Sequence, residues 1–203
     1  GFLGTRSLLP ALSLSDQHDL AVRLLQAHRF PSWGYQIDQG ATTTWERWNS
    51  YIAEAGFGGA QSAINSFSHF AFGSVGEWLF TNLAGIDTEG PGYLRILLRP
   101  RPPTVDSNPE NPPIHWVTAH YEASTGRIVS AWKRTDAGYE FDFTIPTNTT
   151  AAVTLPIANS SRVSENNVPL KSVPGVTSVR EANGNVFFSL GSGEYRFHVS
   201  GIR

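Results

Sequence analysis

Residues 139–145 read Tyr-Glu-Phe-Asp-Phe-Thr-Ile, so apolar side chains alternate strictly with acidic or polar ones. This alternation has the period of a β-strand with one face in a core and the other in water. Turn-forming residues recur on both sides of it, at 124–126, 136–138 and 183–184. The last of these is Asn-Gly, which is typical of tight hairpins. Closely spaced strands joined by such turns predict an antiparallel β-sandwich.

The sequence before this sandwich has a helical pattern instead. A short helix containing Leu20, Leu24 and Leu25 is expected to begin at Ser15 or Asp16 and to end before the Phe-Pro pair. A loop is expected over 32–40, a second helix over 42–52 and a long helix over 66–84. The expected fold class is thus α+β in two parts. Residues 1–88 form a helical domain and residues 89–203 an antiparallel β-sandwich.

Composition excludes several classes of protein. The chain has 203 residues, 40% of them apolar, a net charge of −2, and neither cysteine nor methionine. Without cysteine there is no disulfide scaffold, no thiolate nucleophile and no cysteine-type zinc site. The near-neutral charge argues against nucleic-acid or anionic-membrane partners, and no apolar run approaches the roughly 18 residues of a membrane helix. Because methionine is absent, we expect this chain to be part of a longer polypeptide.

The densest chemical cluster is a group of aromatic and charged side chains in the helical half. Trp33 is followed by Trp45, Glu46, Arg47 and Trp48. Sugars are bound by aromatic faces beside carboxylates, and a carboxylate among indole rings can act as a general base because apolar surroundings favour proton uptake. The alternative is structural: Glu46 pairs with Arg47 or Arg6, and the indoles are core.

His69 is the second candidate. On a helix spanning 66–84 it shares a face with Gly73 and Gly76, and a face of glycines leaves room for a ligand or another helix to approach. A single histidine is also a common structural hydrogen-bonding residue, so both interpretations stay open. The sequence has no phosphate-binding glycine loop, no serine nucleophile elbow and no paired-histidine metal motif, so no metal or organic cofactor is predicted.

At these motifs the sequence resembles the C-terminal part of the glycoside hydrolase family 78 α-L-rhamnosidases. The matching stretches are GTRSLLPAL, HDLAVRLL, FPSWGYQIDQGATTTWERWNS, SFSHFAFGSVGEWLF, AGI and GPGY, in the order of the family. The match is dense to about residue 95, looser through IHWVTAHYEASTGRIVSAWKR, and thin after about residue 150.

The resemblance implies the last helices of an (α/α)6 barrel followed by a β-sandwich, and an enzyme that removes terminal α-L-rhamnose from glycosides with inversion. The glutamate of the WERW motif, Glu46 here, is then the general base. The histidine of the HxAxG segment, His69 here, contacts the rhamnose. Trp45 and Trp33 are implied as walls of the sugar pocket, and no metal ligand is implied.

The resemblance also implies an incomplete site. Inversion needs a second carboxyl group as general acid, which in the family lies upstream of the WERW motif. We therefore expect the chain to be inactive by itself and to need the missing N-terminal part of the same enzyme, either fused or as a separate chain. The alternatives are a non-catalytic carbohydrate-binding or structural β-sandwich module, or a segment of another inverting (α/α)6-barrel glycosidase. Two glycosylation sequons, at Asn148 and Asn159, favour secretion.

Overall fold

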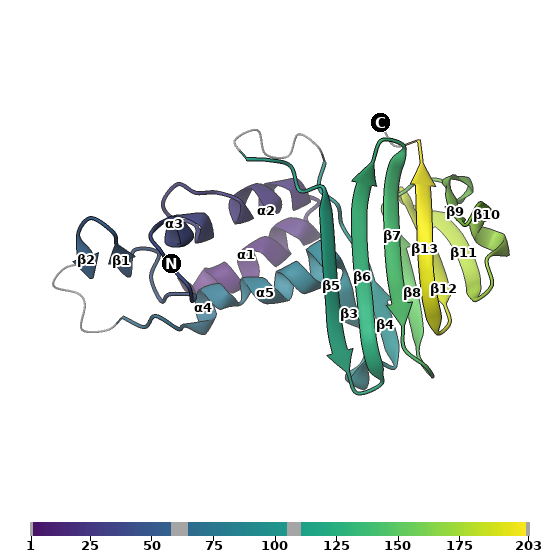
Figure 1. Ribbon diagram of the computed structural model, residues 1–203, viewed down its shortest axis with the longest axis horizontal. Coiled ribbons are helices and arrows are strands. Elements are labelled where there is room, and N and C mark those ends of the chain that lie inside the picture. Colours follow the sequence, from purple (N-terminus) through teal and green to yellow (C-terminus); the bar gives the residue numbers. More distant parts are fainter. Residues whose placement is uncertain (1, 58–64, 105–110, 202–203) are drawn as a thin grey trace. The chain divides into compact units, whose positions relative to one another are not determined.

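In the computed structural model the chain forms two compact units (Figure 1). The structure describes residues 2–57, 65–104 and 111–201. One unit comprises Gly1–Trp78 with Pro103–Pro113, and the other Leu79–Pro102 with Ile114–Arg203. The expected order of helices followed by an antiparallel sandwich is confirmed.

The first unit is built on short helices around α1. Its elements are α1 (Phe2–Leu14), α2 (His18–Leu25), α3 (Trp33–Asp38), α4 (Phe70–Gly73) and α5 (Val75–Trp78), with a small hairpin of β1 (Tyr51–Ile52) and β2 (Gly56–Phe57). Trp78 is 1% exposed, stacks on His18 and donates its indole N–H to Ser13 Oγ at 2.9 Å. With Leu9 and Phe72, it forms the core of this unit.

Three predictions of local structure before residue 85 are wrong. Residues 42–50 form no helix, because their backbone bonds to residues 65–69 far along the chain. Residues 33–38 are the helix α3 instead of a loop, and the Ser32 side chain caps it by accepting a bond from Tyr35 N at 2.9 Å. The helix expected over 66–84 begins only at Phe70, is interrupted at Ser74, and ends as a π-helix over Leu79–Ala84.

The second unit holds two sheets. The six-stranded sheet has the order β10-β9-β13-β7-β6-β5 and the five-stranded sheet the order β11-β12-β8-β4-β3. Neighbours are antiparallel except for β4 and β8, and β13 lies between β7 and β9. The strands are β3 (Ile86–Thr88), β4 (Arg95–Leu98), β5 (Trp116–Ala123), β6 (Gly126–Thr135), β7 (Gly138–Ile145), β8 (Thr150–Leu155), β9 (Val163–Glu165), β10 (Val168–Pro169), β11 (Val176–Ala182), β12 (Asn185–Leu190) and β13 (Gly193–Ser200). Short 3-10 helices span Pro91–Tyr93, Ser160–Arg162 and Leu170–Ser172.

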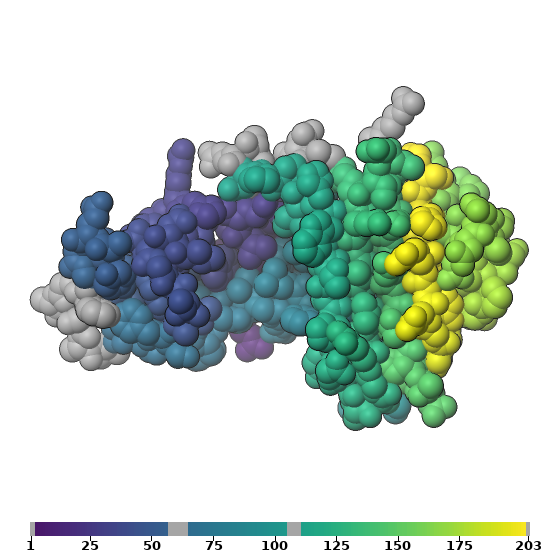
Figure 2. Space-filling view, viewed as in Figure 1, coloured from purple at the N-terminus to yellow at the C-terminus, as the bar shows by residue number. Residues whose placement is uncertain are grey.

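The predicted alternation of β7 is confirmed by burial. Phe141 and Phe143 are 0% and 1% exposed, and Phe197 of β13 packs beside Phe143. The Phe197 ring also meets Phe188 of β12 edge to face, with centroids 5.3 Å apart, so rings from both sheets share one core. The other side of β7 and β13 is polar and ion-paired through Asp142 and Arg196, and Figure 2 shows the outward side chains of β13 in yellow.

The end of the π-helix is anchored by two side chains of β6. Trp132, which is 2% exposed, donates its indole N–H to Leu83 O at 2.9 Å, and Ser130 Oγ donates to Ala84 O at 2.6 Å. Carbonyls at a helix end have no partner inside the helix, so these bonds satisfy them. Gly85 follows with φ +81°, and a Cβ there would lie 2.1 Å from Pro100 N, so glycine is required at this turn.

Candidate active site

Two segments of the first unit run side by side and carry the predicted site residues. Glu46 N donates to Ser66 O at 2.8 Å, and His69 N donates to Thr44 O at 2.9 Å. The short stretch ending at Glu46 is therefore bonded directly to the stretch that leads into α4. Two motifs more than twenty residues apart in sequence are brought together by backbone bonds.

The Glu46 carboxylate is half-buried and held through one oxygen. Its Oε2 accepts a bond from Ser66 N at 2.8 Å. A carboxylate has about four lone-pair positions, so one such bond orients the group and leaves acceptor capacity at Oε1. The structural alternative paired Glu46 with Arg47 or Arg6. Of these two, Arg6 pairs with Glu77 at 3.6 Å instead.

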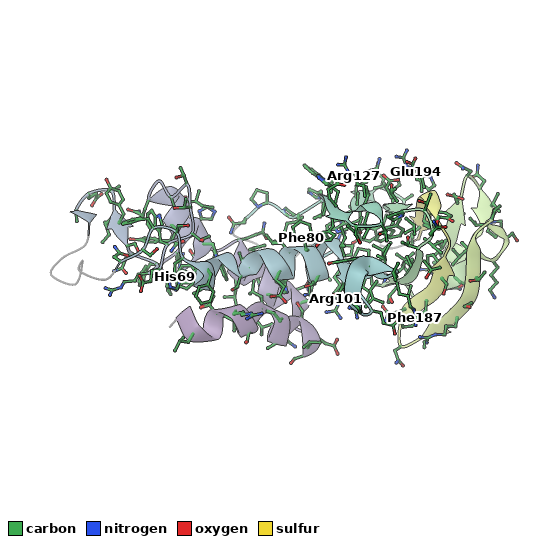
Figure 3. The ribbon with its side chains drawn as sticks, turned by 90° about the horizontal axis from the view of Figure 1, so that it is seen from below. His69, Phe80, Arg101, Arg127, Phe187 and Glu194 are labelled. Carbon is green, nitrogen blue, oxygen red and sulfur yellow. The ribbon has the colours of Figure 1, made fainter. Side chains whose placement is uncertain are left out.

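His69 lies just before α4 instead of on a helical face, as Figure 3 shows at the start of that helix. It is the N-cap residue, and its Nδ1 accepts a bond from Ala71 N at 3.2 Å. An accepting Nδ1 carries no proton, so the neutral ring has its proton on Nε2, where it is a donor. The glycine-face argument for His69 was wrong, because the backbone is not yet helical at this position.

The tryptophans occupy different environments. Trp45 is 4% exposed and meets Phe67 edge to face, with ring centroids 5.6 Å apart. Trp33 is half-buried, donates its indole N–H to Phe72 O at 3.0 Å, and meets Trp48 edge to face. The burial of Trp45 agrees with the packing alternative, and the role of Trp33 and Trp45 as pocket walls stays a prediction.

Several polar residues that support this arrangement were missed. Thr44 Oγ1 donates to His69 O at 3.0 Å, and Thr43 Oγ1 donates to Phe67 O. Ser50 Oγ donates to Asn65 Oδ1 at 2.5 Å, so a hydrogen bond between side chains also joins the two segments at the residues that follow Glu46. The run of three threonines directly before Trp45 was the available signal, because hydroxyl donors beside a candidate carboxylate can fix a neighbouring segment.

The structure offers no metal centre in the part that it describes. Over residues 2–57, 65–104 and 111–201, no three histidine or acidic side chains are grouped as ligands for an ion. In the same ranges, no helix has both the length and the apolar character to cross a bilayer.

Family models assign both halves of the chain to one class of glycosidase. Residues 1–83 match the bacterial α-L-rhamnosidase six-hairpin glycosidase domain. Residues 85–168 match the bacterial α-L-rhamnosidase C-terminal domain. The class is therefore a six-hairpin glycosidase followed by a β-domain, in agreement with the observed order of elements.

Curated relatives and solved structures agree on the family. An α-L-rhamnosidase from Streptomyces avermitilis is 39% identical over 98% of this chain, and one from Formosa agariphila is 32% identical over 98%. The crystal structure of the Streptomyces avermitilis α-L-rhamnosidase complexed with L-rhamnose matches with a TM-score of 0.82, covering 98% of this chain. The structure of the Dictyoglomus thermophilum α-L-rhamnosidase matches at 25% identity with a TM-score of 0.78, covering 99% of this chain and 21% of its own. The chain belongs to the α-L-rhamnosidase family and corresponds to its C-terminal portion. It spans 18% of the Streptomyces avermitilis relative and 20% of the Formosa agariphila relative, about a fifth of their length.

Proposed function

We propose that this chain supplies the general base of an inverting α-L-rhamnosidase, with Glu46 as that base. The observation that supports this most directly is the anchored carboxylate of Glu46. One oxygen is fixed by Ser66 N–H, the group is half-buried, and His69 follows on the same bonded segment. The relatives are named α-L-rhamnosidases, which supports the substrate class that we propose, a glycoside with a terminal α-L-rhamnose.

In the proposed reaction, Glu46 Oε1 takes a proton from a water molecule, whose oxygen attacks the anomeric carbon. The bond to the glycosidic oxygen breaks on the opposite face, and a carboxylic acid protonates that leaving oxygen. Inverting enzymes hold the two carboxyl groups about 6.5–9.5 Å apart, which leaves room for the water. The Nε2–H of His69 donates to a hydroxyl of the sugar. The half-buried indole of Trp33 flanks the ring, and Trp45, which is 4% exposed, supports the wall of the pocket from behind.

We place the general acid outside this sequence, in the part of the enzyme that precedes it in the family. The partner of the chain is accordingly the rest of the same enzyme, fused to it or bound as a separate chain. By itself the chain has the base without the acid, so we expect it not to hydrolyse rhamnosides. A non-catalytic module has no reason to retain the cluster of residues 45–48 together with His69.

The test uses the Streptomyces avermitilis relative as a scaffold. Its matching segment is replaced by residues 1–203, which is feasible because the two sequences are 39% identical over 98% of this chain. The chimera is assayed with an aryl α-L-rhamnoside, and the anomer released first is identified by NMR. Glu46→Gln is compared with Glu54→Gln, a matched change at an exposed glutamate in the turn between β1 and β2.

We expect Glu46→Gln to lower kcat by about 10²–10⁴, because general base catalysis is lost. The amide oxygen of glutamine still accepts from Ser66 N–H, so the variant should fold normally and bind rhamnose. The Glu54→Gln variant should stay within about twofold of the parent, since exposed positions away from such features have small effects. A change below tenfold for Glu46→Gln would remove Glu46 from the mechanism. Release of the α-anomer first would refute inversion, and full turnover by the isolated chain would refute the absence of the acid.

Secretion and glycan attachment at Asn148 and Asn159 also belong to the proposal. Both side chains lie on exposed segments of the β-domain. The intact mass of the native protein, before and after enzymatic removal of N-glycans, tests attachment directly. The same measurement under native and denaturing conditions shows whether a second polypeptide accompanies the chain.

A further inference from the structure

Thr44 bonds both polar backbone atoms of His69. Its carbonyl accepts from His69 N at 2.9 Å, and its Oγ1 donates to His69 O at 3.0 Å. Thr44 is only two residues before Glu46, whose own backbone and side chain bond Ser66. The base and the histidine are therefore both held against one stretch, residues 44–46.

The Thr44 hydroxyl also lies close to the backbone of Gly73 in α4. A Cβ at Gly73 would lie 3.1 Å from Thr44 Oγ1, closer than ordinary van der Waals contact. The absence of a side chain at Gly73 thus leaves room for the threonine. The glycine at position 73 is thus explained by Thr44, which packs closely against α4 at this point.

The ring of His69 is fixed in turn. Its Nδ1 accepts from Ala71 N at 3.2 Å, so the imidazole direction follows the backbone at residues 69–71. A shift of His69 O is then transmitted to the imidazole. Misplacing a positioned group by about 1 Å can cost about 10²-fold in rate.

We infer that Thr44 is a positioning residue, which sets the place of the His69 ring relative to the Glu46 carboxylate. The inference rests on the proposed function, because it assigns to Thr44 an effect on sugar binding and turnover. We assign Thr44 an effect through His69 and no contact of its own with the substrate. Its contribution passes entirely through the hydroxyl bond to His69 O.

The experiment measures kcat, KM and thermal midpoint in the same chimera. Thr44→Val removes the hydroxyl and keeps the shape, and Thr44→Ser keeps the hydroxyl. The matched control is Thr42→Val, because Thr42 is exposed and has no hydrogen bond to any residue that the structure describes. We expect Thr44→Val to lower kcat/KM by about 10–100-fold, with Thr44→Ser within about threefold of the parent and Thr42→Val within about twofold.

A double-mutant cycle separates positioning from general support of the fold. His69→Asn removes the ring but keeps an N-cap side chain for α4. If Thr44 acts through the His69 ring, Thr44→Val should lower kcat/KM by less than about threefold when His69 is already asparagine. An equal loss in both backgrounds, or a parental value for Thr44→Val alone, would overturn the inference.

One further variant, together with the Glu46→Gln variant above, keeps the outcomes distinct. If Thr44→Val does not fold, Gly73→Ala displaces the same hydroxyl by a few tenths of an ångström with every bonding group retained, and the cycle is repeated with it. The expected loss in kcat/KM is about 3–30-fold, again suppressed by His69→Asn. Full activity of Glu46→Gln would refute the proposed function, whereas an inactive Glu46→Gln beside an unaffected Thr44→Val refutes only the role of Thr44.

Discussion

Replacing Trp132 with phenylalanine should destabilise the β-domain by about 2–4 kcal/mol. The indole N–H donates to Leu83 O at 2.9 Å, and the side chain is 2% exposed. Phenylalanine has no donor, so the carbonyl at the end of the π-helix is left buried without a partner at a cost of about 1–3 kcal/mol. The smaller ring also leaves a void, which adds roughly 1 kcal/mol.

The assay is urea unfolding of the chain, followed by far-UV circular dichroism. With an m-value of about 2 kcal/mol/M, the expected loss lowers the midpoint of the β-domain transition by about 1–2 M. The matched control is Trp116→Phe, the same substitution at a position on β5 that is 67% exposed, and it should change stability by less than about 0.5 kcal/mol. Equal shifts for the two variants would refute the reasoning, because they would show that neither the bond nor the burial of Trp132 matters.

Two further predictions concern a close approach and a carboxyl group. Gly34→Ala should strongly destabilise the first unit, because the new Cβ would lie 2.4 Å from Ala27 O. The control is Gly4→Ala, where a Cβ meets nothing within 4 Å. Equal thermal midpoints for the two variants would contradict this prediction. Hydrogen bonds from the Ser160 side chain and backbone N–H lower the pKa of Glu181. Its stabilising effect is therefore present above the ordinary carboxyl range and lost as pH falls through the lowered pKa, so Glu181→Gln should flatten the acid limb of a plot of urea midpoint against pH.

The β-domain was predictable because its signals are local. The alternation over 139–145 indicates a strand, and the structure has β7 there. The Asn183-Gly184 pair indicates a tight turn, and the structure has the β11–β12 hairpin there. The pairing of β4 with β8 was not predictable in this way. It joins strands more than fifty residues apart, and no local pattern encodes such a partner.

The sequence predicts which residues form the candidate site, and these roles stay predictions, whereas the local backbone it predicts there is wrong. Glu46 and His69 stood out by chemistry and by family motif, and the structure bonds their segments. The helix expected over 42–52 does not form, because long-range bonds to residues 65–69 replace the local ones that a helix would need. The loop expected over 32–40 contains the six-residue helix α3, whose N-terminus is capped by the Ser32 side chain. In each case a tertiary or capping bond overrode the propensity of the segment.

The position of β13 also bears on how such a protein is made. Among the strands of the described residues this one comes last in sequence, yet it lies inside the six-stranded sheet, with β7 on one side and β9 on the other. Until the ribosome has released residues 193–200, β7 and β9 have no partner on those edges, and Phe143 and Phe188 lack the ring of Phe197. The six-stranded sheet is therefore complete only after β13 has been synthesised. A premature stop just before Gly193 would remove this interior strand and leave the edges of β7 and β9 open to pairing with other chains.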